Sequence, residues 1–138
     1  MGQKLSYEYI RGIVEGEGCF SFCTVPVKTR DGSIAKATLP SFTLAMSEQD
    51  EELVRKVRDT LGLKNRIYKY PPRKRKDSYN RQSIVVLIVR DVPQLKNIIV
   101  PLFYGGFQGN KARQFENWIE RIGNDPMVPA PYIMIHAL

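Results

Sequence analysis

The stretch YIRGIVEGEGCF, Tyr9 to Phe20, predicts how this 138-residue chain folds. It begins as an apolar helix, passes through three glycines, carries Glu15 and Glu17 at its end, and runs directly into an apolar strand. Gly12 and Gly16 are four apart, so a helix places them on one face, and a face without side chains lets a second helix approach closely. We therefore expect paired helices that bring two acidic ends together. The alternative is an ordinary amphipathic helix with a glycine-rich C-cap, which needs one glycine and no acid.

Composition favours a polyanionic partner. The formal net charge is +7 and the pI is about 9.5, an imbalance typical of nucleic-acid-binding proteins, although charge also serves solubility. The first residues form no signal peptide, and no apolar run is long enough for a transmembrane helix, so we expect an intracellular protein with no membrane partner. Cys19 and Cys23 are too few for a disulfide framework or a zinc site, and we interpret both as reduced.

Periodicity and turn signals predict an α+β chain. The expected helices run from an N-cap at Ser6 to about Gly16, from a capping box at Ser47 to Leu61, over a short segment after Asp91, and from Lys111 to Ile122, where Gly123 ends the last one. The expected strands are Cys19 to Lys28, Ile34 to Met46, Asn65 to Tyr70 and Arg81 to Arg90, with an Asp31-Gly32 turn in the first hairpin. Two hairpins and their helices imply a four-stranded antiparallel or mixed sheet with helices on one face.

The opening stretch resembles the signature of the LAGLIDADG homing endonucleases. The match covers Ile10 to Gly18, and Cys19 and Phe20 continue as the first strand of that family does. Arg11 stands where the namesake motif has alanine, and Glu17 replaces its second aspartate. The family's αββαββα core, with a saddle-shaped sheet, has the element order predicted above.

The resemblance therefore covers about residues 6–123 of a single domain spanning 1–138, with a proline-rich tail at 124–138 that would dock on the core or reach a partner. Because the signature occurs once, the resemblance implies a homodimer, formed through the Tyr9 to Gly16 helix. It also implies an intron- or intein-encoded enzyme that makes a staggered double-strand break in a long DNA site.

One face of the predicted sheet is polar, basic and partly aromatic, which fits a β-ribbon in the major groove of double-stranded DNA. The candidates for DNA contact on these strands are Lys28, Arg30, Lys36, Thr38, Ser41, Thr43, Arg66, Tyr68, Tyr70 and Arg81. Each assignment depends on register, because a shift of one residue reverses the face. The run Arg73, Lys74, Arg75 and Lys76 lies in a loop and is typical of a phosphate clamp, although such a run also suits a solvated loop.

Two catalytic residues follow from the resemblance. Phosphodiester hydrolysis can use a divalent metal held by carboxylates, and oxygen ligands suit Mg²⁺ or another divalent cation such as Mn²⁺. The family assigns the second acid and the preceding carbonyl as metal ligands, here Glu17 and Gly16, whereas Glu15 fits a structural role better. Lys111 matches the family's lysine near the scissile phosphate, unless it is an ordinary first-turn lysine.

Two other functions compete with cleavage. On the same fold, the chain could be an RNA maturase that binds intron RNA, or a DNA-binding regulator without nuclease activity. It could also be a basic RNA-associated protein whose motif match is chance, in which case we expect a monomer.

Overall fold

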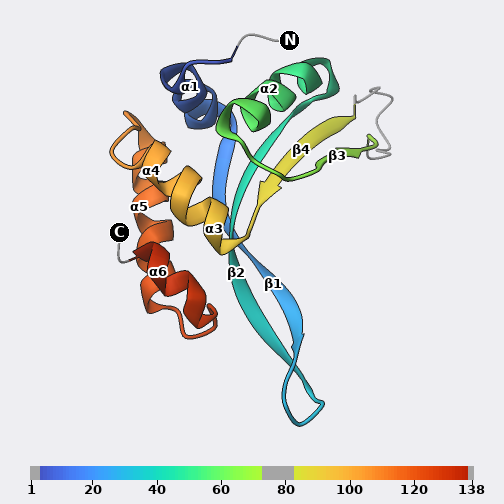
Figure 1. Cartoon of the computed structure of the whole chain (residues 1–138), viewed down its shortest axis with the longest axis vertical. Coiled ribbons are helices and arrows are strands. Elements are labelled where there is room, and N and C mark those ends of the chain that lie inside the picture. The colour runs from blue at the N-terminus through green and yellow to red at the C-terminus, as the bar shows by residue number, and fades with distance from the viewer. Residues whose placement is uncertain (1–3, 73–82, 137–138) are drawn as a thin grey trace. The chain divides into compact units, whose positions relative to one another are not determined.

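The computed structural model describes residues 4–72 and 83–136, and it confirms the predicted α+β class (Figure 1). Its helices are α1 (Tyr7–Glu17), the 3-10 turn η1 (Glu48–Asp50), α2 (Glu51–Leu61), α3 (Val92–Gln94), the π-helical η2 (Leu95–Ile99), α4 (Val100–Phe103), α5 (Asn110–Asn124), the 3-10 turn η3 (Ala130–Tyr132) and α6 (Ile133–His136). Its strands are β1 (Gly18–Lys28), β2 (Ile34–Ser47), β3 (Ile67–Tyr70) and β4 (Ile84–Val89). The strands form one antiparallel sheet in the order β1-β2-β4-β3.

The residues group into two compact units. The first comprises Met1–Cys19 and Thr43–Ile88, and the second comprises Phe20–Phe42 and Val89–Leu138. The strands β1 and β2 each have residues in both units, because the division falls within these two strands.

In the first unit, α1 forms for the local reasons that its sequence predicts. The Ser6 side chain accepts a hydrogen bond from the Tyr9 N–H at 3.1 Å, which satisfies one donor of the first turn. Ile10 and Val14, four residues apart, are fully buried. The helix ends where the Gly18 N–H bonds the Val14 carbonyl and the chain becomes extended.

Gly18 is fixed by the close approach of Val14. A Cβ at Gly18 would lie 2.5 Å from Val14 Cγ1 and 2.9 Å from the Val14 carbonyl oxygen, and the buried Val14 has no room to move. We therefore expect Gly18→Ala to lower the free energy of unfolding by about 1–3 kcal/mol through overpacking. Chemical denaturation measures the change. Gly16→Ala is the control, because its Cβ would meet nothing within 4 Å in the single chain, and at protein concentrations at which the chain is monomeric we expect a gain of about 0.5–1 kcal/mol in helix stability. Equal effects at the two glycines would contradict this account.

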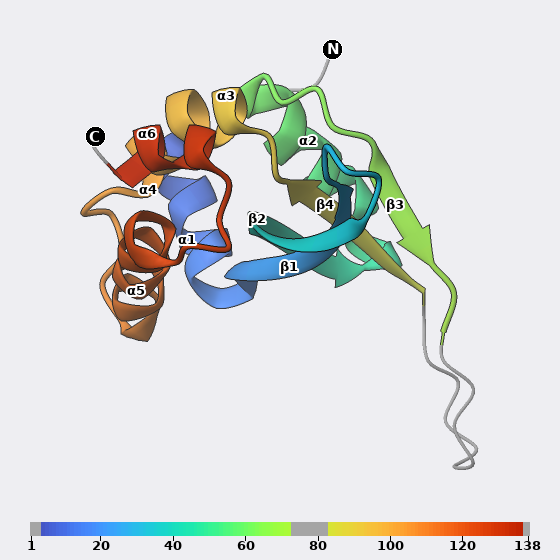
Figure 2. The same ribbon diagram turned by 90° about the horizontal axis from the view of Figure 1, so that it is seen from below.

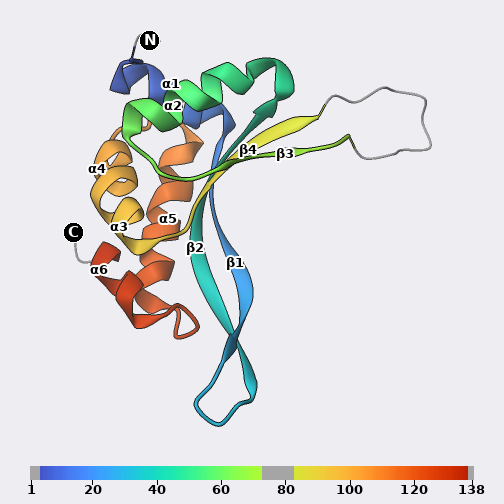
Figure 3. The same ribbon diagram turned by 45° about the vertical axis from the view of Figure 1, so that its right-hand side comes forward.

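The strands β3 and β4 run side by side (Figure 3) and pair in an antiparallel register that sorts their side chains onto two faces. Ile67 pairs with Leu87, and Tyr68 pairs with Val86. Both partners on β4 are buried, so the exposure of the β3 side chains decides the faces, and Ile67 is half-buried beside Leu87. Tyr68 and Tyr70 then lie on the opposite face, where each is 46% exposed.

The second unit is built around the aromatic ring of Phe20. Five rings lie with their centroids 5.0–5.8 Å from it: Phe42, Phe103, Phe107, Phe115 and Trp118. Edge-to-face and tilted rings at this spacing contribute beyond the area they bury. The Trp118 Nε1–H donates to the Ser21 carbonyl at 2.8 Å, so α5 is attached to β1 by a hydrogen bond as well as by packing.

Two predicted helix boundaries were wrong. Ser47 ends β2 and caps the 3-10 turn η1 by accepting from the Gln49 N–H, so α2 begins only at Glu51. Gly123 does not end the last helix, which continues to Asn124. A Cβ at Gly123 would lie 2.5 Å from His136 ring carbons, so this glycine makes room for α6.

The tail, left open by the sequence, docks within the second unit (Figure 2). The Tyr132 hydroxyl donates to the Arg90 carbonyl at 2.6 Å, and the Thr38 N–H donates to the Met127 carbonyl at 2.9 Å. Burial raises the pKa of the Tyr132 hydroxyl, and the nearby Asp91 carboxylate adds to the effect. The phenol therefore stays protonated and keeps its role as donor.

Candidate active site and nucleic-acid interface

Glu17 is the last residue of α1, and its side chain is exposed. Among the residues that the structure describes, none forms a hydrogen bond or ion pair with its carboxylate. The helix dipole places negative partial charge at this end and disfavours an acid there, and no basic residue lies in the last turn. A cation bound at this end would offset the negative charge of the Glu17 carboxylate and the negative partial charge of the helix end.

The donor set at the end of α1 fits a hard divalent cation. Gly16 lies in the last turn, where helical carbonyls lack N–H partners within the helix. One carboxylate and one carbonyl suit Mg²⁺, which keeps several waters and takes few protein ligands. Within residues 4–72 and 83–136, no three His, Cys, Asp or Glu side chains cluster into a metal site. Glu15 is half-buried and has an interaction partner, which suits a structural role.

The glycine face of α1 is open. Gly12 and Gly16 are both exposed, and a Cβ at either would meet nothing within 4 Å. Tyr9, which is 52% exposed, borders the same face. The helix thus buries Ile10 and Val14 in its own unit and leaves the two glycines uncovered.

Lys111 lies in the first turn of α5 and is connected to β1 through Gln114. The Lys111 Nζ lies 3.3 Å from Gln114 Oε1, and the same oxygen accepts the Phe20 N–H at 3.3 Å. One amide oxygen therefore orients the ammonium group and fixes it to the strand that follows the glycine-rich motif. Gln114 was missed from the sequence, although its i+3 spacing from Lys111 was a signal that could have found it.

Arg66, Tyr68 and Tyr70 form an exposed row along β3. The two tyrosine rings are stacked with centroids 6.5 Å apart, and the Arg66 guanidinium lies 5.7 Å from the Tyr68 ring centre. Lys69, on the other face, pairs with Glu48 at 3.3 Å. This alternation places the row on the face of β3 opposite Lys69.

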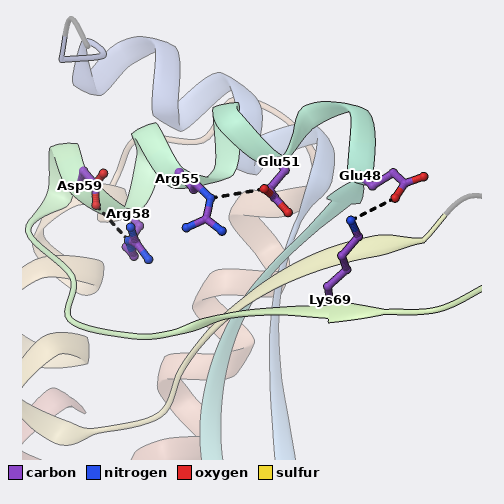
Figure 4. A network of polar contacts seen from close by, with 6 residues as sticks. All are labelled: Glu48, Glu51, Arg55, Arg58, Asp59 and Lys69. Carbon is purple, nitrogen blue, oxygen red and sulfur yellow. Dashed lines mark hydrogen bonds and ion pairs between the residues drawn. The ribbon is translucent and has the colours of Figure 1, made fainter. Parts of the chain in front are cut away.

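The cations of this chain divide into paired and unpaired groups. Around α2, acidic partners neutralise Arg55, Arg58 and Lys69 (Figure 4). In contrast, Lys28, Arg30 and Lys36 on the β1–β2 hairpin are exposed, and no acidic side chain in the described part of the chain pairs with them. Unpaired cations can neutralise phosphates without first breaking an ion pair.

The hairpin turn that presents these cations is closed by hydrogen bonds to Asp31. The Asp31 carboxylate accepts from the Ser33 N–H at 3.0 Å, and from the hydroxyls of Ser33 and Thr29. Gly32 takes the left-handed conformation at φ 84° that the turn requires. The hydrogen bonds from Ser33 and Thr29 hold the pKa of Asp31 well below its usual range.

The remaining residues predicted to contact DNA form three groups: one is half-buried, two are buried and five lie outside the described residues. Thr43 is half-buried. Thr38 and Ser41 are only 7% and 2% exposed, so we leave them out of the interface, because a side chain without exposure cannot reach a base. Five predicted contacts lie outside the described residues: Arg73, Lys74, Arg75, Lys76 and Arg81.

Known proteins share the sequence motif and the fold of this chain. A family model described as LAGLIDADG endonuclease matches residues 10–122. The homing endonuclease I-TnaI has 23% identity and a TM-score of 0.64, with 87% of this chain and 72% of that one covered. The I-LtrWI LAGLIDADG homing endonuclease, solved bound to target DNA, has 27% identity and a TM-score of 0.65, with 94% of this chain and 41% of that one covered.

The group I intron-encoded homing endonuclease I-CeuI, solved with DNA, has 18% identity and a TM-score of 0.63, with 91% and 59% covered. This chain therefore spans about two fifths of I-LtrWI and three fifths of I-CeuI. No curated protein matches the sequence. None of the helices in the described residues combines the length and apolarity needed to cross a bilayer.

Proposed function

Because the chain belongs to the LAGLIDADG endonuclease family, we propose that it is a homing endonuclease that cuts both strands of a long DNA site as a homodimer, using a divalent metal. The observation that carries this proposal is Glu17, an exposed carboxylate without a protein partner among the described residues, at the end of a helix whose glycine face is open. Two copies that pair through this face would bring two such carboxylates together.

The duplex is held by the side chains that the structure leaves exposed. Lys28, Arg30 and Lys36 supply unpaired positive charge from the hairpin, and the row from Arg66 to Tyr70 offers donors and flat rings. Phosphate contacts set affinity and position, whereas contacts to base edges set sequence preference. Arg66 is the residue in this row best suited to guanine, whose two major-groove acceptors match a guanidinium.

Hydrolysis is assigned to residues at two helix ends. Glu17 and the Gly16 carbonyl would hold Mg²⁺, which when bound activates water and neutralises phosphate charge. Lys111 would face the developing negative charge with an ammonium group that Gln114 has already oriented. Preorientation of this kind avoids reorganisation during the reaction, and the shared hydrogen bond to the Phe20 N–H keeps Gln114 in place.

Removing the charge of Lys111 tests its role. We expect Lys111→Met to lower kcat by about 100-fold, the usual scale for one electrostatic contact to a transition state, with DNA affinity changed by less than about threefold. Single-turnover cleavage and fluorescence anisotropy measure the two quantities. Lys96→Met is the matched control, because Lys96 lies on η2 and has no assigned role. If both substitutions slow cleavage equally, Lys111 has no specific function.

Gln114 gives a second comparison at the same site. Gln114→Glu keeps an acceptor for both the Phe20 N–H and the Lys111 ammonium, so we expect kcat close to that of wild type. Gln114→Leu removes the acceptor and should lower kcat about tenfold while leaving KM nearly unchanged. If both variants lose kcat equally, or if the loss in Gln114→Leu only follows a loss of folded protein, Gln114 does not act by orienting Lys111.

The target site can be selected from random DNA. A randomised duplex library is incubated with the protein and Mg²⁺, adaptors are ligated to the cut ends, and the products are sequenced. We expect one family of related sites with staggered ends, and no products when EDTA replaces Mg²⁺. Binding of the library without cut ends would favour a splicing or regulatory protein on the same fold.

A further inference from the structure

A groove runs between α5 and β1 within the second unit, and it shares Gln114 with the proposed cleavage site. One wall carries amide and guanidinium side chains of α5, namely Asn110, Arg113, Gln114, Asn117 and Arg121, and the other carries Ser21 and Phe22. No acidic side chain is among the described residues that line it. Asn110, Arg113 and Asn117 lie along one face at helical spacing, and all three are exposed.

Charge is separated across the two sides of α5. The groove beside β1 carries two arginines, whereas the hollow on the other side of the helix carries Glu116, Glu120 and His136. A helix whose charges served only solubility would mix the signs around its exposed surface. The separation therefore favours an anionic occupant on the β1 side.

The edge of β1 is closed to an added peptide strand at this place. β1 is an edge strand, and such edges commonly bind extended peptides through main-chain hydrogen bonds. Here the Phe20 N–H already donates to Gln114, and the Ser21 carbonyl already accepts from Trp118. The occupant must therefore be recognised by the side chains of the groove.

Arg121 is held at two points in the groove. Its guanidinium carbon lies 4.1 Å from the centre of the Phe22 ring, and its Nε lies 2.9 Å from Asp125 Oδ2. These contacts hold the guanidinium group near the ring, while 52% of the side chain remains exposed. Arginine guanidinium groups and aromatic rings are both surfaces on which an unpaired nucleobase stacks.

We propose that this groove binds single-stranded nucleic acid, either RNA or a DNA strand released from its duplex. Arg113 pairs with a backbone phosphate, Asn110 and Asn117 donate hydrogen bonds beside it, and a base stacks over Arg121 and Phe22. Duplex DNA is a poor occupant, because its bases are stacked on one another and cannot reach a protein ring. Binding in this groove needs neither Glu17 nor a metal ion, and of the residues assigned to cleavage only Gln114 is among the described residues that line it.

Fluorescence anisotropy of the full chain with labelled strands of about twelve nucleotides, a usual footprint for such sites, tests the proposal. The probes are oligouridylate, oligodeoxyuridylate and a mixed-sequence duplex. We expect Arg113→Gln to weaken single-strand binding at least about fivefold, and the slope of log K against log salt to fall by about 0.7, the value for one lost phosphate. Phe22→Leu should weaken binding of single strands and leave the salt slope unchanged.

Arg90→Gln is the control, because Arg90 is exposed in the same unit and lies outside the groove. Tighter binding of the single strands than of the duplex supports the site. The ratio of the affinities for the RNA and DNA strands then shows whether the ribose hydroxyl is recognised. Equal losses in Arg113→Gln and Arg90→Gln would overturn it, because the attraction would then be general. Equal losses for duplex and single strands would also overturn it. The rate of duplex cleavage by Arg113→Gln should match that of wild type. A failure of the single-strand proposal can therefore be told apart from a failure of the nuclease proposal.

Discussion

Replacement of Glu17 by glutamine should leave binding of the target duplex nearly unchanged and slow cleavage by about a thousandfold. The substitution keeps the size of the side chain and removes its negative charge, so it removes the only exposed acid at the end of α1 that lacks a partner among the described residues. A metal that activates water and stabilises phosphate charge contributes several kcal/mol to the transition state, and about 4 kcal/mol corresponds to that factor. Single-turnover cleavage and anisotropy give the two quantities.

The control for this experiment is Glu15→Gln. Glu15 is half-buried and already has a partner, so we expect a loss of stability with the cleavage rate within about tenfold of wild type. The proposal fails if Glu17→Gln cuts as fast as wild type. It also fails if Glu17→Gln loses DNA binding in proportion to cleavage, because the carboxylate would then act in recognition or folding.

Replacement of Gly16 by leucine should separate the dimer without harming the monomer. A Cβ at Gly16 meets nothing within 4 Å in the single chain, and leucine favours a helix by several tenths of a kcal/mol over glycine. A close helix pair has no such room, because the glycines let the two backbones approach. We expect the dimer dissociation constant to rise at least about tenfold and double-strand cleavage to fall with it, while the free energy of unfolding of the monomer does not decrease.

Graded substitution at Gly12 adds a control. Gly12 is also exposed and open in the single chain, so alanine and leucine both have room in the monomer. We expect alanine to raise the dimer dissociation constant less than leucine does, because its side chain is smaller. Analytical ultracentrifugation measures this constant. A dimer that tolerates leucine at both positions would show that another surface pairs the two copies.

Most of the fold could be predicted because its signals are local. The Ser6 cap, the Asp31-Gly32 turn and the αL Gly62 after α2 each act within a few residues, and so their sequence patterns are sufficient. The faces of β3 also followed from alternation once Ile67 was assigned inward, and Ile67 is less exposed than Tyr68 and Tyr70, as that assignment requires.

What the sequence missed depends on contacts between distant segments. Gly123 carries the pattern of a helix end, yet its role is to admit the His136 ring. Thr38 and Ser41 alternate like exposed strand residues but are buried, and alternation alone does not show what covers a strand. Gln114 contacts Phe20 across 94 positions of sequence, a separation that no local pattern spans. The tail lacked strong periodicity, and its place is set by the Tyr132 hydroxyl on the Arg90 carbonyl.

The most direct measurement is the anomalous scattering of Mn²⁺ in crystals of the protein with its selected duplex, grown with wild type and with Glu17→Gln. For wild type, the account predicts a manganese peak bound by the Glu17 carboxylate and the Gly16 carbonyl, beside a DNA phosphate, where the two α1 helices of a dimer meet. The peak should be lost from the Glu17→Gln crystals while the duplex stays bound. Manganese bound elsewhere, or a Glu17 carboxylate that points away from both metal and phosphate, would contradict the proposed role of Glu17 as a metal ligand.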